Sequence, residues 1–274
     1  MFAKRSIVIL FLICGWAFPV QVVASPATPL LKALAKYFSK EGAEKLTKEV
    51  SEEMTERVAN NLVREGGEKM FEHVAELAAK HGPDIIRALD NAPDIKSILK
   101  AIDELPADDV AKAAQRLAAG GTGRELASMT QEYGAKVLLA EVKQPGVGSR
   151  LVRVWGDDGA SLCGRLTKDE AISLGKYADD LAMVPSAQRN QLLEVIERDK
   201  DRFFRWLGDF IQKNPGKTIG SATFLAVFLP NSERILGGDE IAFDANGNPV
   251  VLHKSGLLEA PAEILGTAVG PGLS

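Results

Sequence analysis

Residues 81–99, HGPDIIRALDNAPDIKSIL, show how this chain is built. The stretch contains one pattern twice: a proline and an aspartate precede apolar residues at helical spacing. Proline in the first turn of a helix gives up no hydrogen bond, and an early aspartate interacts favourably with the positive end of the helix dipole. Gly82 can end the preceding helix. The pattern therefore predicts short helices joined by tight turns, and residues 105–113, LPADDVAKA, repeat it more loosely.

Helical periodicity continues on both sides of this stretch. In residues 43–63, apolar residues recur at every fourth position, with charged residues on the other side, which is typical of an amphipathic helix. The apolar set is Leu46, Val50, Met54, Val58 and Leu62. Residues 124–142 and 149–184 also favour helix, and Thr167 and Glu170 have the spacing of a capping box. The sequence predicts an all-α fold, either of stacked helical hairpins or as an irregular helical bundle.

The apolar run at residues 218–229 could belong either to the protein core or to a membrane. As a helix it would be about 18 Å long, whereas the apolar part of a bilayer is about 30 Å thick. The turn KNPG at residues 213–216 would fold it back onto the longest predicted helix, residues 186–213. We expect a buried helix, with an interfacial or membrane-inserted helix as the alternative. The predicted core or membrane contacts are Phe203, Phe204, Trp206, Phe210, Phe224 and Phe228.

A short β-hairpin is predicted near the C-terminus. In residues 239–254, DEIAFDANGNPVVLHK, two segments of alternating polarity flank the turn-forming sequence DANGN. The glycine of DANGN stands at the fourth place, whereas a calcium loop needs it at the sixth, so we expect no calcium site. The last residues, 266–274, are expected to be frayed.

The N-terminus has the pattern of a secretory signal peptide. Lys4 and Arg5 precede an apolar stretch at residues 7–20, and Val22 and Ala24 have the spacing that a signal peptidase recognises. We expect cleavage near Ala24 and export to the periplasm or the extracellular space. The alternative is an uncleaved N-terminal anchor.

The charge of the chain argues against nucleic acid as a partner. The whole chain has a formal net charge of −4, and the chain without residues 1–24 would have about −6, because Lys4 and Arg5 are the only charged residues removed. A mildly acidic chain is poorly suited to neutralise phosphate backbones. Cleavage would also leave Cys163 as the single cysteine, so no internal disulfide could form, and we expect Cys163 to be buried.

Cofactor motifs are weak throughout the chain. Residues 214–218, NPGKT, match only the end of a phosphate-binding loop, since Ile211 stands where the first glycine should be. We therefore expect no nucleotide and no other cofactor. Residues 120–125, GGTGRE, are interpreted as a flexible linker, with an anion site at a helix start, formed by backbone N–H groups and Arg124, as the alternative. The histidines are too scattered to suggest a metal site; they are His73, His81 and His253.

Asp157 and Asp158, in WGDDG at residues 155–159, are the weak candidates for catalysis. Two carboxylates can act as acid and base on a glycosidic bond. A pair of this kind more often stands at the start of a helix, where it favours the helix dipole.

The expected organisation has four parts. They are a signal peptide at 1–24, an N-terminal helical-hairpin region at 25–144, a C-terminal helical region at 145–238, and a hairpin with a frayed tail at 239–274. Residues 120–123 and 144–148 are both candidate boundaries, and the second is preferred.

The predicted function is that of an exported, non-enzymatic interaction or scaffold module that binds a protein of the cell envelope. Stacked helices offer extended surfaces for such contacts. Two alternatives stay open. One is a membrane-attached protein that uses the 218–229 helix, and the other is an envelope-polymer hydrolase that uses Asp157 and Asp158.

Overall fold

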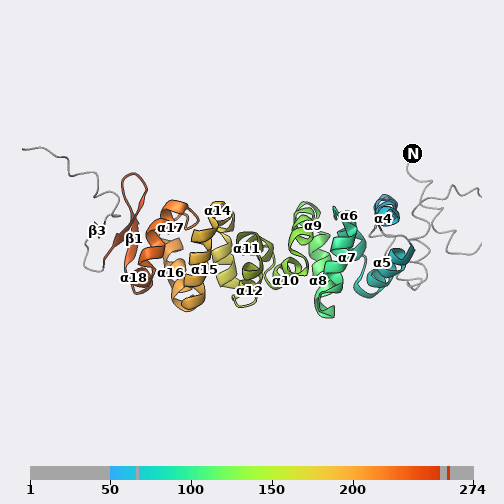
Figure 1. The fold of residues 1–274 in the computed structure, drawn as a ribbon, viewed down its shortest axis with the longest axis horizontal. Helices are drawn as coiled ribbons and strands as arrows, with labels where there is room; N and C mark the ends of the chain where they lie inside the picture. Colours follow the sequence, from blue (N-terminus) through green and yellow to red (C-terminus); the bar gives the residue numbers. More distant parts are fainter. Residues whose placement is uncertain (1–49, 66–67, 254–257, 260–274) are drawn as a thin grey trace, which may run out of the picture. The chain divides into compact units, whose positions relative to one another are not determined.

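The computed structural model describes residues 50–65, 68–253 and 258–259, and these residues are predominantly helical (Figure 1). They end in a small antiparallel sheet, so the prediction of an all-α fold with a short hairpin is confirmed. The predicted signal peptide, Leu46 and the predicted frayed tail lie outside the described residues. The chain divides into two compact units, unit 1 up to Val142 and unit 2 from Lys143, and each is described by itself.

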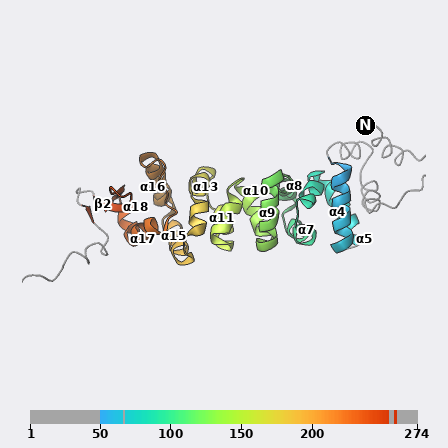
Figure 2. The same ribbon diagram turned by 90° about the horizontal axis from the view of Figure 1, so that it is seen from above.

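Unit 1 consists of short helices packed on one another. They are α4 (Glu52–Glu65), α5 (Glu68–His81), α6 (Asp84–Asp90), α7 (Ile95–Asp103), α8 (Ala107–Leu117), α9 (Gly120–Tyr133) and α10 (Ala135–Lys143), which ends at the first residue of unit 2. Helix α6 packs against α4, α5 and α8, and α7 packs against α9. Figure 2 shows α4 beside α5 and α8 beside α9. Ile85, Ile86 and Leu89 of α6 are fully buried in this core.

The starts of α6, α7 and α8 follow the proline–aspartate pattern. Pro83 and Pro106 stand directly before the first residues of α6 and α8. The Asp94 side chain caps α7, because it accepts a hydrogen bond of 3.1 Å from the Lys96 N–H.

Several helices are shorter than the periodicity predicts. The segment expected as one helix at residues 43–63 has a bend at Val50, and α4 begins after Ser51, whose hydroxyl accepts from the Met54 N–H at 3.2 Å. The segment at 124–142 is interrupted at Gly134, where φ is 66°. This left-handed backbone is compatible with glycine but not with a continuous helix.

The interpretation of residues 120–125 as a flexible linker is wrong, because they form the first turns of α9. Helix α9 approaches α8 so closely that a Cβ atom added at Gly123 would lie 2.1 Å from the Leu117 carbonyl oxygen. The same oxygen accepts a hydrogen bond of 2.8 Å from the Asn91 side chain. These glycines therefore serve helix packing.

Unit 2 is also built from short helices. They are α11 (Gly148–Trp155), α12 (Asp157–Cys163), α13 (Lys168–Gly175), α14 (Ala178–Met183), α15 (Ser186–Arg198), α16 (Lys200–Lys213), α17 (Ala222–Phe228), the 3-10 helix η1 (Leu229–Asn231) and α18 (Ser232–Leu236). The predicted capping box is confirmed: Thr167 and Glu170 bond each other's backbone N–H groups. The single long helix predicted for 186–213 is wrong, because Asp199, with φ −146° and ψ 59°, separates α15 from α16.

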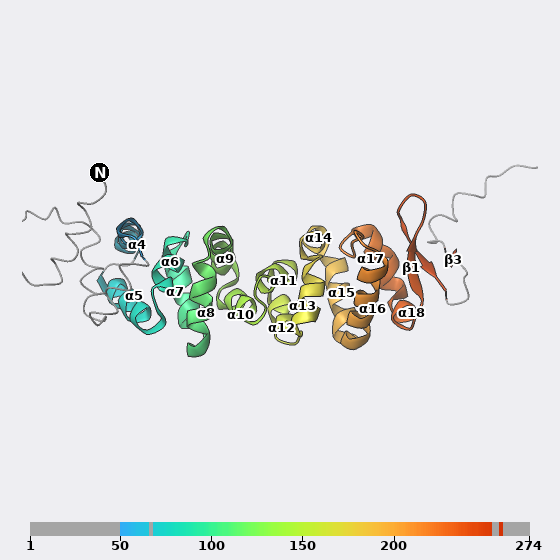
Figure 3. The same cartoon turned by 180° about the vertical axis from the view of Figure 1, so that it is seen from behind.

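The sheet of unit 2 follows α18 (Figure 3). Its strands are β1 (Glu240–Phe243), β2 (Pro249–Leu252) and β3 (Leu258–Glu259), in the order β1-β2-β3 with antiparallel pairing. Glu240 pairs with Leu252 and Phe243 with Pro249. The Asp244 carboxylate closes the turn by accepting from the N–H groups of Asn246 and Asn248, both at 2.8 Å. The sequence did not predict β3.

Candidate functional site

An aromatic cluster forms the part of the core of unit 2 that lies between α16 and α17. Phe203, Phe224 and Phe228 are essentially inaccessible to solvent. The ring of Trp206 stacks on that of Phe228 with centroids 4.7 Å apart, and Phe210 meets Phe224 edge-on at 5.3 Å. Phe204 lies half-buried at the margin, 5.2 Å from Phe203. Aromatic pairs at these separations add to the stability that area burial provides.

The apolar run at residues 218–229 supplies one side of this cluster. Its helical part is α17, and the Ser221 hydroxyl caps that helix by accepting from the Phe224 N–H at 3.1 Å. The rings of Phe224 and Phe228 both point into the core of unit 2. Among the helices that the structure describes, none combines the length and the apolar character that a bilayer span requires.

A groove with a volume of about 770 Å³ lies beside the aromatic cluster. One wall is a single face of α16 with residues 214, 215 and 217 that follow it. The other is formed by the end of α18, by residues 237–239, by β1 and by Leu252 of β2. The α16 residues recur at intervals of three and four, which places them on one face of the helix. They are Arg202, Arg205, Trp206, Asp209, Phe210 and Lys213. We call this site the α16 groove.

Ion pairs neutralise the acidic residues of the strand-side wall. The Lys213 ammonium lies 2.6 Å from the Glu240 carboxylate, and this hydrogen bond raises the pKa of Lys213. Asp239 lies 3.1 Å from His253 Nδ1 and 3.3 Å from the Arg234 guanidinium. The groove acids that belong to the sheet region therefore already have cationic partners.

The helix-side wall keeps cationic groups exposed. The Lys217 ammonium lies 4.5 Å from the centroid of the Phe243 ring, a cation–π contact. Arg202 lies 3.4 Å from Asp199, at the start of α16. Arg205 is exposed and has no ion pair with any residue in the described ranges. Neither Arg205 nor Lys217 forms an ion pair with a carboxylate of the groove within the described residues. Their two positive charges therefore remain available to a ligand.

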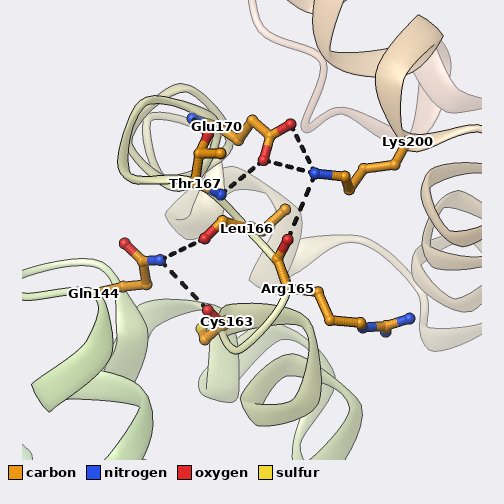
Figure 4. Close-up of polar contacts among 7 residues, drawn as sticks. All are labelled: Gln144, Cys163, Arg165, Leu166, Thr167, Glu170 and Lys200. Atoms are coloured by element: carbon orange, nitrogen blue, oxygen red, sulfur yellow. Dashed lines mark hydrogen bonds and ion pairs between the residues drawn. The ribbon is translucent and has the colours of Figure 1, made fainter.

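A second polar cluster connects the end of α12 with the starts of α13 and α16 (Figure 4). We call it the polar junction. The buried Gln144 amide donates to the carbonyl oxygens of Cys163 at 3.4 Å and Leu166 at 2.9 Å. The Lys200 ammonium, at the first residue of α16, lies 3.0 Å from both oxygens of Glu170. These bonds satisfy backbone groups at a helix end and hold the start of α16 on α13.

The carboxylate of Glu170 has an altered acidity in this junction. Burial raises its pKa, but hydrogen bonds from the Thr167 backbone N–H and from Lys200 act in the opposite direction and prevail. The pKa of Glu170 is therefore lower than the ordinary value of 4.5.

Asp157 and Asp158 do not lie in the α16 groove. Both side chains are exposed in the first turn of α12, directly after Gly156, where φ is 58°. Carboxylates at this position favour the helix dipole. The interaction with the dipole of α12 explains why two carboxylates stand at this position. Catalysis by this pair stays an untested prediction.

His73 and His253 each contact an aspartate. His73 Nε2 lies 2.9 Å from Asp103, which joins α5 to α7, and His253 contacts Asp239. Within residues 50–65, 68–253 and 258–259, no group of three or more His, Cys, Asp or Glu side chains could hold a metal ion. Cys163 is buried, as expected, and its thiol lies 3.9 Å from the Gly148 carbonyl oxygen.

Sequence reasoning identified the aromatic residues of α16 but missed the groove on its neighbouring face. The available signal was the recurrence of charged residues along α16 at 202, 205, 209 and 213, which continues the helical period beside Trp206. The second wall, residues 235–243, comes from a later segment whose proximity only the fold reveals.

Comparisons of this chain with protein-family models, with curated proteins and with solved structures found no match.

Proposed function

We propose that this chain is an exported helical module that binds another protein, and that the α16 groove is its binding surface. The signal-peptide pattern at residues 1–24 supports export. The observation that carries the binding role is the α16 face itself, where the half-buried Trp206 lines the groove together with the exposed Arg202 and Arg205. Tryptophan and arginine dominate the binding energy at protein interfaces.

The physical properties of this face suit a protein partner. The body of Trp206 is anchored on Phe228, so its remaining exposed surface can be buried on binding at little cost in side-chain entropy. Arg205 extends from the same face and has five N–H donors for carboxylates or carbonyl groups. A rigid aromatic anchor with flanking arginines is typical of the centre of an interface.

The test is site-specific photo-crosslinking of the full chain in the cells that produce it. A photo-reactive amino acid replaces Pro215, which is exposed and lines the groove, so Arg205 and Trp206 stay in place. A control chain carries the same amino acid in place of Arg116, which is exposed on α8 of unit 1. We expect one identifiable protein to be crosslinked from position 215 and not from position 116. No protein adduct at 215, or the same adducts at both positions, would contradict the proposal.

The membrane-attached role and the hydrolase role stay predictions without a supporting observation. The rings of Phe224 and Phe228 are buried, so a membrane contact through them would require α17 to leave the core. Asp157 and Asp158 lie in the first turn of α12, where carboxylates interact favourably with the helix dipole.

A further inference from the structure

Strand β1 is an edge strand of the sheet. The strand order is β1-β2-β3, so β1 pairs with β2 on one side and with no other described strand on the opposite side. An edge strand presents backbone N–H and C=O groups that another extended chain can pair with. Natural proteins often use such an edge to bind a peptide as an additional strand.

The hairpin register identifies which backbone groups point away from β2. The Asp244 N–H donates to the Asn248 carbonyl at 2.9 Å, so residues 244 and 248 form a hydrogen-bonded pair. Hydrogen-bonded and non-hydrogen-bonded pairs alternate along an antiparallel ladder. Ile241 and Phe243 therefore belong to non-hydrogen-bonded pairs, and their N–H and C=O groups point outward. The partner of Phe243 is Pro249, which has no N–H to donate and fits this assignment.

The α16 groove runs along this outward edge. Five successive residues, 239–243, line the groove. Successive side chains of a strand point to opposite faces of the sheet. A wall that includes both sets of side chains follows the backbone edge of β1, and it extends onto one face of the sheet at Leu252 of β2, the partner of Glu240. The outward groups of Ile241 and Phe243 thus face the space between β1 and α16.

The charges around this space favour an acidic occupant. Glu240 and Asp239 have cationic partners, whereas neither Arg205 nor Lys217 has an ion pair among the described residues, and the Lys217 ammonium lies over the Phe243 ring. Asp209 is the only carboxylate among the α16 residues that line the groove. Its negative charge disfavours a carboxylate of the occupant beside the same turn of the helix. An occupant with carboxylates at Arg205 and Lys217 would complement both cations.

A second copy of this chain is a poor occupant for the same reason. Antiparallel pairing of two β1 strands about Ala242 would set Glu240 of each strand against Asp244 of the other. Like charges directly opposite each other destabilise a strand pair. The geometry therefore favours a different chain over self-association.

We propose that β1 is a docking edge for an extended, acidic segment of the partner protein, which adds to the sheet as a strand along β1 and displaces the Lys213 and Phe210 side chains from their contacts with Glu240 and Phe243. This inference rests on the proposed binding function of the α16 groove. The segment's backbone pairs with Ile241 and Phe243, and its carboxylates lie at Arg205 and Lys217. Backbone pairing supplies affinity, and the cations supply the preference for acidic sequences.

The test uses the full chain and fluorescein-labelled peptides in fluorescence anisotropy. The probe is the peptide Thr-Val-Glu-Val-Glu-Val-Thr, compared with a peptide in which lysine replaces glutamate. Two further peptides carry N-methyl groups on either the valine or the glutamate amides. We expect the acidic peptide to bind, the lysine peptide to bind at least about tenfold more weakly, and one of the two N-methylated peptides to lose binding.

Matched variants separate the backbone contribution from the side-chain contributions. Phe243→Pro removes an outward N–H, whereas Phe243→Ala removes the same ring and keeps the N–H. We expect Phe243→Pro to bind the acidic peptide about tenfold more weakly than Phe243→Ala. Arg205→Gln should lower affinity by a similar factor, whereas Arg116→Gln should leave it unchanged. Circular dichroism checks that each variant is folded.

The outcomes distinguish strand addition at β1 from the binding function of the α16 groove, on which it rests. Absence of peptide binding, with the crosslink from position 215 retained, would overturn strand addition and leave the α16 groove as the binding surface. Equal binding of both N-methylated peptides would show a purely electrostatic contact and would also overturn it. A dimer in size-exclusion chromatography that Phe243→Pro dissociates would assign the edge to a second copy instead. Loss of both crosslink and peptide binding would reject the function and the inference together.

Discussion

Glu170 shows how one side chain links helix capping to packing between helices. Its carboxylate accepts from the Thr167 N–H at 2.7 Å and also pairs with Lys200 from α16. The pKa of Glu170 is lowered in the folded protein, so this carboxylate stabilises the fold above its unfolded pKa, about 4.5. The stabilisation is lost as the pH falls through the lower folded value.

We therefore expect Glu170→Gln to lower the free energy of unfolding near neutral pH and to make that free energy less dependent on pH below about 4.5. Urea unfolding at a series of pH values measures both effects. The control is Glu194→Gln, at an exposed position on α15. A Glu170→Gln curve parallel to that of the unchanged protein, at every pH, would contradict the assignment. NMR titration of Lys200→Met should show the Glu170 pKa rise, because the cation that favours the carboxylate is gone.

Helix starts could be predicted from the sequence better than helix interruptions. Proline and aspartate act through local backbone chemistry, which is why the starts of α6, α7 and α8 follow from the residues themselves. The interruption at Asp199 has a weaker signal, because an aspartate precedes α16 without a proline or glycine beside it and without a side-chain cap bond. Good helix formers continue on both sides, and the backbone change accompanies the tertiary contact of Lys200 with Glu170. Gly123 was misread because its role depends on the close approach of Leu117, a residue of another helix. The α16 groove was missed for the same reason.

The packing of α17 on α16 predicts that the aromatic residues of the cluster contribute unequally to the free energy of unfolding. Phe228 is fully buried and contacts the rings of Phe203, Trp206 and Phe224, whereas Phe204 is half-buried and lies at the margin. We expect Phe228→Ala to cost about 3–5 kcal/mol in the free energy of unfolding, because it leaves a cavity in the core. Phe204→Ala should cost about 1 kcal/mol. Urea unfolding of the two variants makes the comparison, and equal losses would place the centre of the cluster elsewhere.

At the scale of the whole molecule, each of the two units contains a buried core of its own. Ile86 lies in the core of unit 1 and Phe228 in that of unit 2, and both are inaccessible to solvent. Proteins open in cooperative segments whose stability follows their own buried contacts. The two cores should therefore respond separately to substitution.

Hydrogen–deuterium exchange of the full chain tests this separation. We expect Phe228→Ala to speed exchange of the backbone amides in α16 and α17 while those in α6 and α7 keep their rates. Ile86→Ala should have the reverse effect, since it removes buried volume only from unit 1. If either variant accelerated exchange equally in both units, the chain would unfold as a single cooperative body. The expected result would instead mean that unit 2, with the α16 groove and the edge strand β1, keeps its binding surface intact while unit 1 opens.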